Sequence, residues 1–409
     1  MAYHHLVNLG YKSDHEIPFS HDEIIAMLLE DGQLKEGSVN SFKSFCKIVK
    51  SIYHFEFHDQ LGKLKESYRV FNPDLQDVED DKTARSKPFS TMLNSIDSLM
   101  IKANYNEVSE KNIERALVAE SIIPVSLEIN FEEFETYKVY YQGQSNGKSK
   151  VNSIIPFLKK EVEYEYYNRV VFLFKVKELS YLNSKTKNSS ILRPGKVYLK
   201  YLRNIPKLDL EMIFPNPKPK MNLIDKVQIW VPLILGIGIP LKAFIYDPYV
   251  IKSVASPFEE GISIPVLGFL FALFGFSFKT YSKYKFQILS LQREIAESLY
   301  FKDIGNNEAV LTSLVDVAEE EEVKEVILAY YFLLNSSNTL SSAQLDEKIE
   351  RWMKNSHNTI IDFDVSDGLR KLESLNILNC VDAQNYSVQN LNDTLKILDR
   401  SWDNYFQHS

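Results

Sequence analysis

The sequence predicts an α+β membrane protein with N-terminal helices, a small antiparallel sheet domain, a two-helix transmembrane hairpin and a C-terminal winged-helix-like domain. Three observations lead to this prediction. Apolar residues recur at helical spacing over residues 20–70, strand-like segments cluster between 121 and 205, and two long apolar segments follow. The expected parts are a helical region at 1–120, a β-rich cytoplasmic domain at 121–220, the hairpin at 227–278, a connecting helix at 279–320 and the winged-helix-like domain at 321–409.

Composition excludes several classes of protein. The 409 residues suffice for two or three domains, and 44% hydrophobic with 25% charged residues is typical of globular folds. A net charge of −8 argues against non-specific binding of nucleic acid, which needs clustered cations. Cys46 and Cys380 are too few for a disulfide framework or a cysteine-based zinc site. The N-terminus has the pattern of neither a signal peptide nor a transit peptide.

The first half of the chain changes from helical to extended periodicity. Ser20 and Glu23 form the pattern of a capping box, and a second helix is expected from 41 to 68. Segments such as EVEYEYYNRVVFLFKVK are rich in Val, Tyr and Phe, which favours strands. The polar segments QSNGKSK, 144–150, and NSKTKNSS, 183–190, are predicted to be turns or loops.

The two apolar segments, 227–246 and 262–278, have twenty and seventeen residues. Spanning helices need about twenty, with a minimum near seventeen, so both meet the length requirement. A pair of buried core helices is the alternative. Because basic flanks stay on the cytoplasmic side, both termini are expected there, in a bacterial inner membrane or alternatively a mitochondrial inner membrane. The membrane-flanking basic residues are Lys218, Lys220, Lys226, Lys279, Lys283 and Lys285.

The C-terminal third predicts helices followed by a small hairpin. Residues 279–300 contain no Gly or Pro, which favours an uninterrupted helix. The segment EEEEVKEVILAYYFLLN, 319–335, predicts a helix with an acidic first turn. The next helix can be capped by Ser341 or Ser342, and the one after it by Asp364 or Ser366. Two short extended pieces and a last helix complete a winged-helix order. From Glu322 onwards there are 8 basic and 13 acidic residues, a net charge of −5, so we expect no DNA binding.

Several blocks of the chain carry a resemblance to a known family. They are FKSFCKIVKSIYHFEFHDQLGKLKESYRVFNPD, NIPKLDLEMIFPNPKPKMNLIDK, VKEVILAYYFLLN, LDEKIERWM and VSDGLRKLESLNIL. With these blocks in this order, the chain resembles the transmembrane-protein-143-like family over nearly its whole length. The resemblance implies a two-span membrane protein and brings no established activity, cofactor or catalytic residue.

Local motifs for catalysis or metal binding are weak. His54 and His58 lie four apart on a predicted helix, so they are the candidates for a metal site, but no third ligand is visible. The segment GQSNGKSK misses the phosphate-loop spacing by one residue. No catalytic or cofactor-binding residue and no cofactor is predicted.

Three hypotheses on function remain open. The first is a non-enzymatic membrane-anchored protein that binds partners or senses a state with its cytoplasmic domains. The second is a membrane-bound enzyme with a site in the sheet domain, and the third is an oligomeric pore of the toxic or defensive kind. The expected partners are the lipid bilayer, unidentified proteins and, as an open option, further copies of the chain.

Overall fold

The fold is described from a computed structural model. It describes residues 15–35, 37–75, 89–109, 111–113, 126–152, 159–178, 192–215, 218–220, 246, 264–382 and 384–404. The chain divides into two compact units, and each is described by itself. The first comprises residues 1–110, 131–207 and 303–409, and the second comprises 111–130 and 208–302.

Three N-terminal helices belong to the first unit: α1 (His21–Glu30), α2 (Val39–Tyr68) and α3 (Phe89–Lys102). Ser20 caps α1, because its hydroxyl accepts from the Glu23 backbone N–H while the Glu23 carboxylate accepts from the Ser20 N–H. This is the capping box that the sequence predicts. Over two turns, α2 buries Phe42, Phe45 and Val49 at three-to-four spacing, which fixes the face that it presents to the core.

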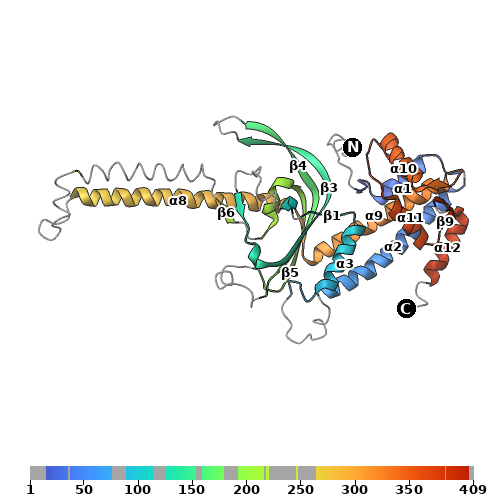
Figure 1. Ribbon diagram of the computed structural model, residues 1–409, viewed down its shortest axis with the longest axis horizontal. Coiled ribbons are helices and arrows are strands. Elements are labelled where there is room, and N and C mark those ends of the chain that lie inside the picture. The colour runs from blue at the N-terminus through green and yellow to red at the C-terminus, as the bar shows by residue number, and fades with distance from the viewer. Residues whose placement is uncertain are drawn as a thin grey trace. The chain divides into compact units, whose positions relative to one another are not determined.

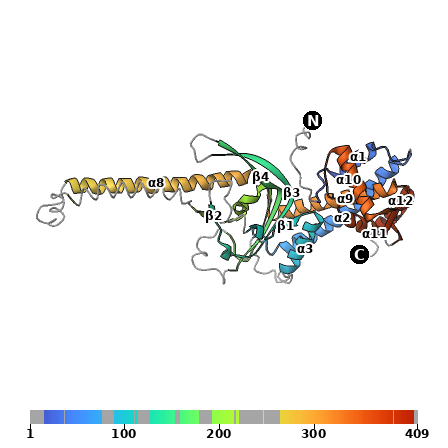
Figure 2. The same cartoon turned by 45° about the horizontal axis from the view of Figure 1, so that its top comes forward.

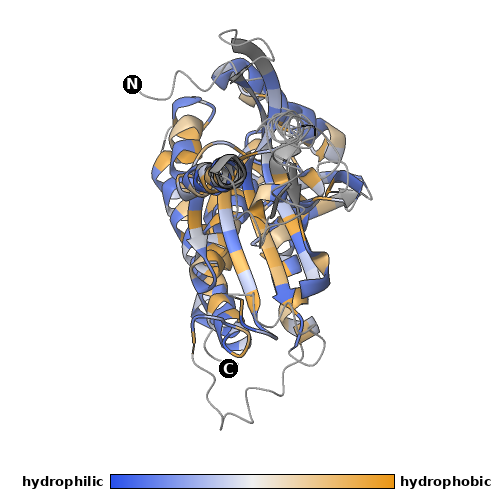
Figure 3. Ribbon diagram, turned by 90° about the vertical axis from the view of Figure 1, so that its left-hand side faces the viewer, coloured by the Kyte–Doolittle hydropathy of each residue, from blue (hydrophilic) through white to orange (hydrophobic). Residues whose placement is uncertain are grey.

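A five-stranded antiparallel sheet lies beside these helices (Figures 1 and 2). Its order is β1-β3-β4-β5-β7, with short β7 pairing to β5 from far along the chain. In Figure 3, apolar and polar residues follow one another along the strands, as expected where only alternate side chains face the helices. The strands are β1 (Asn106–Glu107), β3 (Phe134–Asn152), β4 (Lys159–Val176), β5 (Val197–Pro206) and β7 (Asp303–Asn306), and a 3-10 turn, η3 (Phe131–Glu133), precedes β3.

The predicted turn at 144–150 is wrong, because these residues continue β3 and pair with β4. Gly147 lies opposite Tyr164, and the Tyr164 ring occupies the space where a side chain at Gly147 would stand. An aromatic ring that covers a strand glycine compensates for its missing side chain, so the turn-like composition does not end the strand. The predicted loop at 183–190 lies outside the described residues.

The C-terminal part of the first unit has the order helix, strand, two helices, two strands and helix. Its small sheet has the order β8-β10-β9, the arrangement of a winged-helix domain. Ser341 caps α10 in a second capping box, and the Asp364 carboxylate accepts from the Asp367 backbone N–H at the start of α11. The elements are α9 (Glu308–Leu334), β8 (Leu340–Ser341), α10 (Ser342–His357), α11 (Val365–Ser374), β9 (Leu378–Asp382), β10 (Asn385–Val388) and α12 (Leu391–Asn404).

Helix α9 is the centre of the first unit, and it is buried along most of its length. The Tyr330 ring stacks on Phe45 of α2 with 4.0 Å between ring centroids. One apolar core joins α1, α2, α3, α9 and the C-terminal helices to the facing side of the sheet. The predicted N-terminal and C-terminal helical domains therefore share one core rather than two.

The predicted start of this helix is wrong, because the acidic run at 319–322 lies in the middle of α9 and not in its first turn. Glu321, Glu322 and Glu325 are almost completely buried beside Lys324 and Lys371. Lys324 donates to Glu321 Oε1 at 2.9 Å and to the Ile17 carbonyl at 2.7 Å. Buried carboxylates are tolerated here because buried ammonium groups pair with them.

The second unit contains a long helix and a two-stranded sheet. In this sheet β2 (Ser126–Glu128) pairs antiparallel with β6 (Lys218–Lys220). A 3-10 turn, η4 (Lys207–Ile213), precedes β6 in the chain. The helix α8 (Ile264–Tyr300) has 37 residues and includes the helix predicted over 279–300 without a break. It ends at Tyr300 and β7 follows, so the connecting helix does not extend to residue 320.

Among the described residues, which include Tyr246 but not the rest of the first apolar segment, no helix combines the length and apolarity needed to cross a bilayer. The uncharged part of α8 runs from Ile264 to Phe278 before Lys279 follows. At 1.5 Å per residue this part is about 22 Å long, whereas the hydrocarbon core of a bilayer is about 30 Å thick. This finding contradicts the predicted transmembrane hairpin, the fold class of a membrane protein and the location in a bacterial inner membrane.

Candidate functional site

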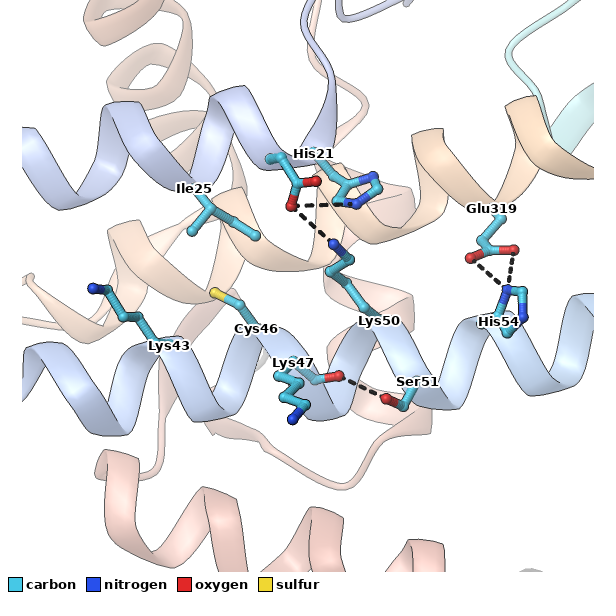
Figure 4. Close-up of a pocket in the computed structure, with 10 residues that line it drawn as sticks. His21, Ile25, Lys43, Cys46, Lys47, Lys50, Ser51, His54 and Glu319 are labelled. Atoms are coloured by element: carbon cyan, nitrogen blue, oxygen red, sulfur yellow. Dashed lines mark hydrogen bonds and ion pairs between the residues drawn. The ribbon is translucent and has the colours of Figure 1, made fainter.

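A groove of about 520 Å³ lies between α1 and α2 in the first unit, beside α9 (Figure 4). We call it the lysine groove, because three of its lining side chains are lysines of α2. It is lined by His21, Asp22, Ile25, Lys43, Cys46, Lys47, Lys50, Ser51, His54 and Glu319.

The lysines follow from the periodicity of α2. Lys43, Lys47 and Lys50 are spaced by four and three residues, so they form one stripe of the helix (Figure 4). Because Phe42, Phe45 and Val49 fill the neighbouring core face, the lysine stripe is left at the border between core and solvent. Lysines at such a border bury their methylene groups and keep their ammonium groups in water.

Lys50 is paired within the groove. Its ammonium donates to the Asp22 carboxylate of α1 at 2.8 Å. This hydrogen bond is the main reason that the pKa of Asp22 lies below its usual value. Asp22 therefore stays ionised at neutral pH and neutralises one of the three lysines.

Two histidines of the groove contact α9. His21 lies in hydrogen-bonding contact with Glu320 through both its ring Nδ1 and its backbone N–H. His54 Nδ1 lies 3.1 Å from a carboxylate oxygen of Glu319. Burial opposes ionisation of Glu320, but the hydrogen bonds from His21 outweigh it and leave the pKa of Glu320 below its usual value. These contacts attach α1 and α2 to the same turn of α9.

The groove does not supply an activated nucleophile. Burial raises the pKa of the Cys46 thiol to about 12, so this cysteine is neutral at physiological pH. The Ser51 hydroxyl donates to the Lys47 carbonyl at 2.9 Å rather than to a base. A cysteine acts as a nucleophile in its thiolate form and a serine through a hydroxyl beside a base, and neither Cys46 nor Ser51 meets its condition.

Lys43 and Lys47 are the cations with spare binding capacity. Within the described part of the chain, neither ammonium group has a carboxylate within ion-pair distance. Both side chains are exposed and neighbour the paired Lys50. The arrangement can bind the oxygen atoms of an anionic group, because each ammonium offers three donors and a full positive charge.

The sequence-predicted metal candidates are adjacent on α2. The rings of His54 and His58 have centroids 6.3 Å apart, and His54 is already engaged with Glu319. Over the described ranges, no group of three or more His, Cys, Asp or Glu side chains is placed to hold a metal ion. His54 instead belongs to the lysine groove, a role that its spacing to His58 does not indicate.

The six basic residues predicted to flank a membrane lie in other surroundings. Lys218 and Lys220 are part of β6 and pair in register with Glu128 and Ser126. Lys279, Lys283 and Lys285 are exposed on α8. The Lys285 ammonium lies 5.7 Å from the centroid of the Tyr281 ring. Lys226 is outside the described residues. The first apolar segment, which Lys218, Lys220 and Lys226 are predicted to flank, lies outside the described residues apart from Tyr246, so the flanking role stays a prediction.

Sequence reasoning missed the lysine groove because its parts come from three elements. The spacing of Lys43, Lys47 and Lys50 is visible in the sequence, but a basic stripe is more often a solvated helix face than a site. The contributions of Asp22 and Glu319 depend on how α1 and α9 pack against α2, and no local pattern encodes that packing.

A family model matches part of the chain. Residues 167–309 match the family model described as "Protein of unknown function (DUF3754)", which covers about a third of the chain. No solved structure matches the chain significantly. The matched description does not name the transmembrane-protein-143-like family, and the match does not reach the lysine groove. A DUF3754 domain, whose function is unknown, thus covers residues 167–309 of this protein.

Proposed function

We propose that this protein is a non-enzymatic binding protein that recognises an acidic segment of a partner protein through the lysine groove. The observation that carries the proposal is that Lys43 and Lys47, one turn apart on α2, have no carboxylate partner among the described residues.

The charge of the groove is opposite to that of the whole chain. The protein has a net charge of −8, whereas the groove presents three lysines against Asp22 and Glu319. A local positive region on an acidic protein attracts anionic groups to one place and repels them elsewhere. Such a distribution favours a specific acidic partner over general polyanion binding.

The shape of the groove suits a segment of chain. The first and last of the three lysines are seven positions apart on α2, which corresponds to about 10 Å along the helix axis at 1.5 Å per residue. Acidic residues four apart on a second helix have the same spacing as Lys43 and Lys47, so two carboxylates can face the two ammonium groups that Asp22 does not neutralise. The state of Cys46 and Ser51 favours binding over covalent chemistry.

The proposal is tested by fluorescence anisotropy with a short fluorescein-labelled poly-glutamate peptide and the full-length protein. The double variant Lys43→Gln/Lys47→Gln removes the two unpaired cations and should weaken binding on the order of tenfold, since exposed charge contacts contribute up to about 1 kcal/mol each. Binding by the native protein should also weaken as salt rises, because salt screens exposed charges.

The matched control is Lys63→Gln/Lys65→Gln, which removes the same charge from the same helix outside the groove. This control should bind the peptide as the native protein does. Equal weakening by both double variants would show that only net charge matters, and it would overturn the assignment of the groove. Absence of saturable peptide binding to the native protein would overturn the proposed function itself.

A further inference from the structure

A second hollow, of about 660 Å³, lies in the first unit between α2, α3, α9 and α11. We call it the Tyr53 hollow. It shares no lining residue with the lysine groove, so it is a separate site on the same unit. Its lining includes Tyr53, Glu56, Lys102, Glu322, Arg370 and Lys371.

The Tyr53 hydroxyl is a donor without a partner among the described residues. Only 6% of Tyr53 is exposed, yet its hydroxyl makes no hydrogen bond with any of them. Its oxygen is not completely enclosed, so the small exposed part of the residue includes it. Buried tyrosines normally place the hydroxyl against a hydrogen-bond partner, whereas Tyr53, which lines the hollow, has none among the described residues.

The hydroxyl remains protonated. Burial raises the pKa of Tyr53 well above its usual value, and the nearby carboxylates Glu322 and Glu56 raise it further. The positive charge of Arg370 acts in the opposite direction but does not offset them. The Tyr53 hydroxyl therefore offers an O–H to an acceptor that enters the hollow.

The hollow contains charges of both signs, of which Lys371 is fully paired whereas Glu56, Lys102 and Arg370 are only partly paired. The Lys371 ammonium lies 3.1 Å from Glu322, and both groups are almost completely buried. The Lys102 ammonium lies 3.7 Å from Glu56, beyond ordinary hydrogen-bond length. Arg370 bonds to Asp367 through one nitrogen while its side chain is 73% exposed, so other donors of its guanidinium stay accessible.

We propose that the Tyr53 hollow binds a small zwitterion of the α-amino-acid type. Its carboxylate accepts the Tyr53 O–H and an N–H of Arg370, and its ammonium group binds the Glu56 carboxylate. Among the described residues that line the hollow, Tyr53 is the only buried donor without a partner. Arg370 and Glu56 are the most exposed basic and acidic side chains of the lining.

The balance of charge selects against ligands with a single charge. The lining contains three acidic groups, with Asp97 beside Glu56 and Glu322, and three basic groups. A lone carboxylate leaves Glu56 without a new counter-ion, and a lone amine leaves the Tyr53 O–H unused. A zwitterion satisfies both ends, because charges that lose water need partners of opposite sign.

The test is ligand-observed NMR on the full-length protein with a mixture of the free L-amino acids, followed by calorimetry of those that bind. Propionate and ethylamine serve as singly charged analogues of alanine. At least one amino acid should bind saturably, and the two analogues should bind at least tenfold more weakly. If no amino acid binds, or if propionate binds as well as alanine does, the proposal is wrong.

Two variants locate the site. Tyr53→Phe removes only the hydroxyl and, because that hydroxyl has no partner among the described residues, the fold should be retained while affinity falls on the order of tenfold. Arg370→Gln should weaken binding similarly. Its control is Arg351→Gln, which removes an exposed arginine of α10 that pairs with Glu347 one turn earlier on the same helix. Unchanged affinity in both Tyr53→Phe and Arg370→Gln would overturn the proposal.

This site and the lysine groove can fail separately. The variant Lys43→Gln/Lys47→Gln should bind the amino acid with unchanged affinity, and Tyr53→Phe should bind the poly-glutamate peptide with unchanged affinity. A loss of amino-acid binding in the lysine variant would place the zwitterion elsewhere and refute the assignment to the Tyr53 hollow.

Discussion

Replacement of Lys371 by methionine tests the role of the charges buried around α9. The Lys371 ammonium contacts three carboxylates, with Glu322 at 3.1 Å, Asp367 at 2.6 Å and Glu325 closer still. The side chain is 5% exposed, so water cannot replace the lost partner. Breaking a buried ion pair from one side costs about 3–5 kcal/mol, and we expect Lys371→Met to lower the free energy of unfolding by this amount at pH 7.

The pH dependence separates lost charge from lost packing. Burial raises the pKa of Glu325 above its usual value even beside Lys371. Without the ammonium this pKa rises further, so Glu325 takes up a proton at a higher pH in the variant than in the native protein. The destabilisation should therefore shrink as the pH falls from 7 to 5, and Lys371→Met/Glu325→Gln should recover part of the lost stability at pH 7.

Urea denaturation followed by tryptophan fluorescence, to which Trp352, buried in α10, contributes, measures both effects. Lys354→Met, an exposed lysine on α10, is the control and should change the free energy of unfolding by less than about 0.5 kcal/mol. A loss of under 1 kcal/mol in Lys371→Met, or a loss independent of pH, would refute the reasoning.

Three further predictions concern other parts of the first unit. Asp31→Ala should lower the free energy of unfolding by about 2–4 kcal/mol in urea denaturation, because the Asp31 carboxylate accepts from both the Tyr331 hydroxyl and the Trp352 indole N–H at 2.9 Å. Equal stability of Asp31→Ala and the native protein would contradict this. Glu320→Gln should cost about 1 kcal/mol or less at pH 7, after allowing for partial exposure to solvent. Because the pKa of Glu320 in the folded protein is below its usual value of 4.5, its stabilisation is present above pH 4.5 and is lost as the pH falls further, so the two unfolding curves should converge in acid. The full-length protein should show no salt-sensitive DNA binding in a mobility-shift assay, because the net charge of its winged-helix part, from Glu322 onwards, is −5; micromolar binding at physiological salt would refute this.

The sequence predicts elements best where the signal is local. The capping boxes at Ser20 and Ser341 are visible as residue patterns, and both are present. The strand-rich region contains β3, β4 and β5, but β1 and β7 lie outside it because each consists of only a few residues that pair far from their neighbours in sequence. Short strands carry too few residues to establish a period.

The errors arise where tertiary packing overrides local composition. A run of four glutamates normally indicates a solvated helix start, yet in α9 Glu321 and Glu322 are buried because Lys324 and Lys371 lie against them. The pairing with Lys371 joins positions nearly fifty residues apart, and no local window contains both. The polar run 144–150 continues β3 for the same reason, since β4 supplies its partner strand.

The apolar segments show a different limit of sequence reasoning. Length and apolarity alone predicted spanning helices, whereas the part inside α8 is shorter than a bilayer core before its first lysine. The lysine groove could be predicted only in part. The spacing of the lysines on α2 is visible in the sequence, but no sequence pattern shows that residues of α1 and α9 lie beside them.

Hydrogen–deuterium exchange of the full-length protein, with and without the poly-glutamate peptide, tests the role of the lysine groove most directly. The proposal predicts slower exchange of backbone amides in α1 and in residues 39–54 of α2 when the peptide is present. It also predicts that Lys43→Gln/Lys47→Gln abolishes this protection. Protection confined to other elements, or protection of the same segments that survives in the double variant, would contradict the claim that the groove is the binding site.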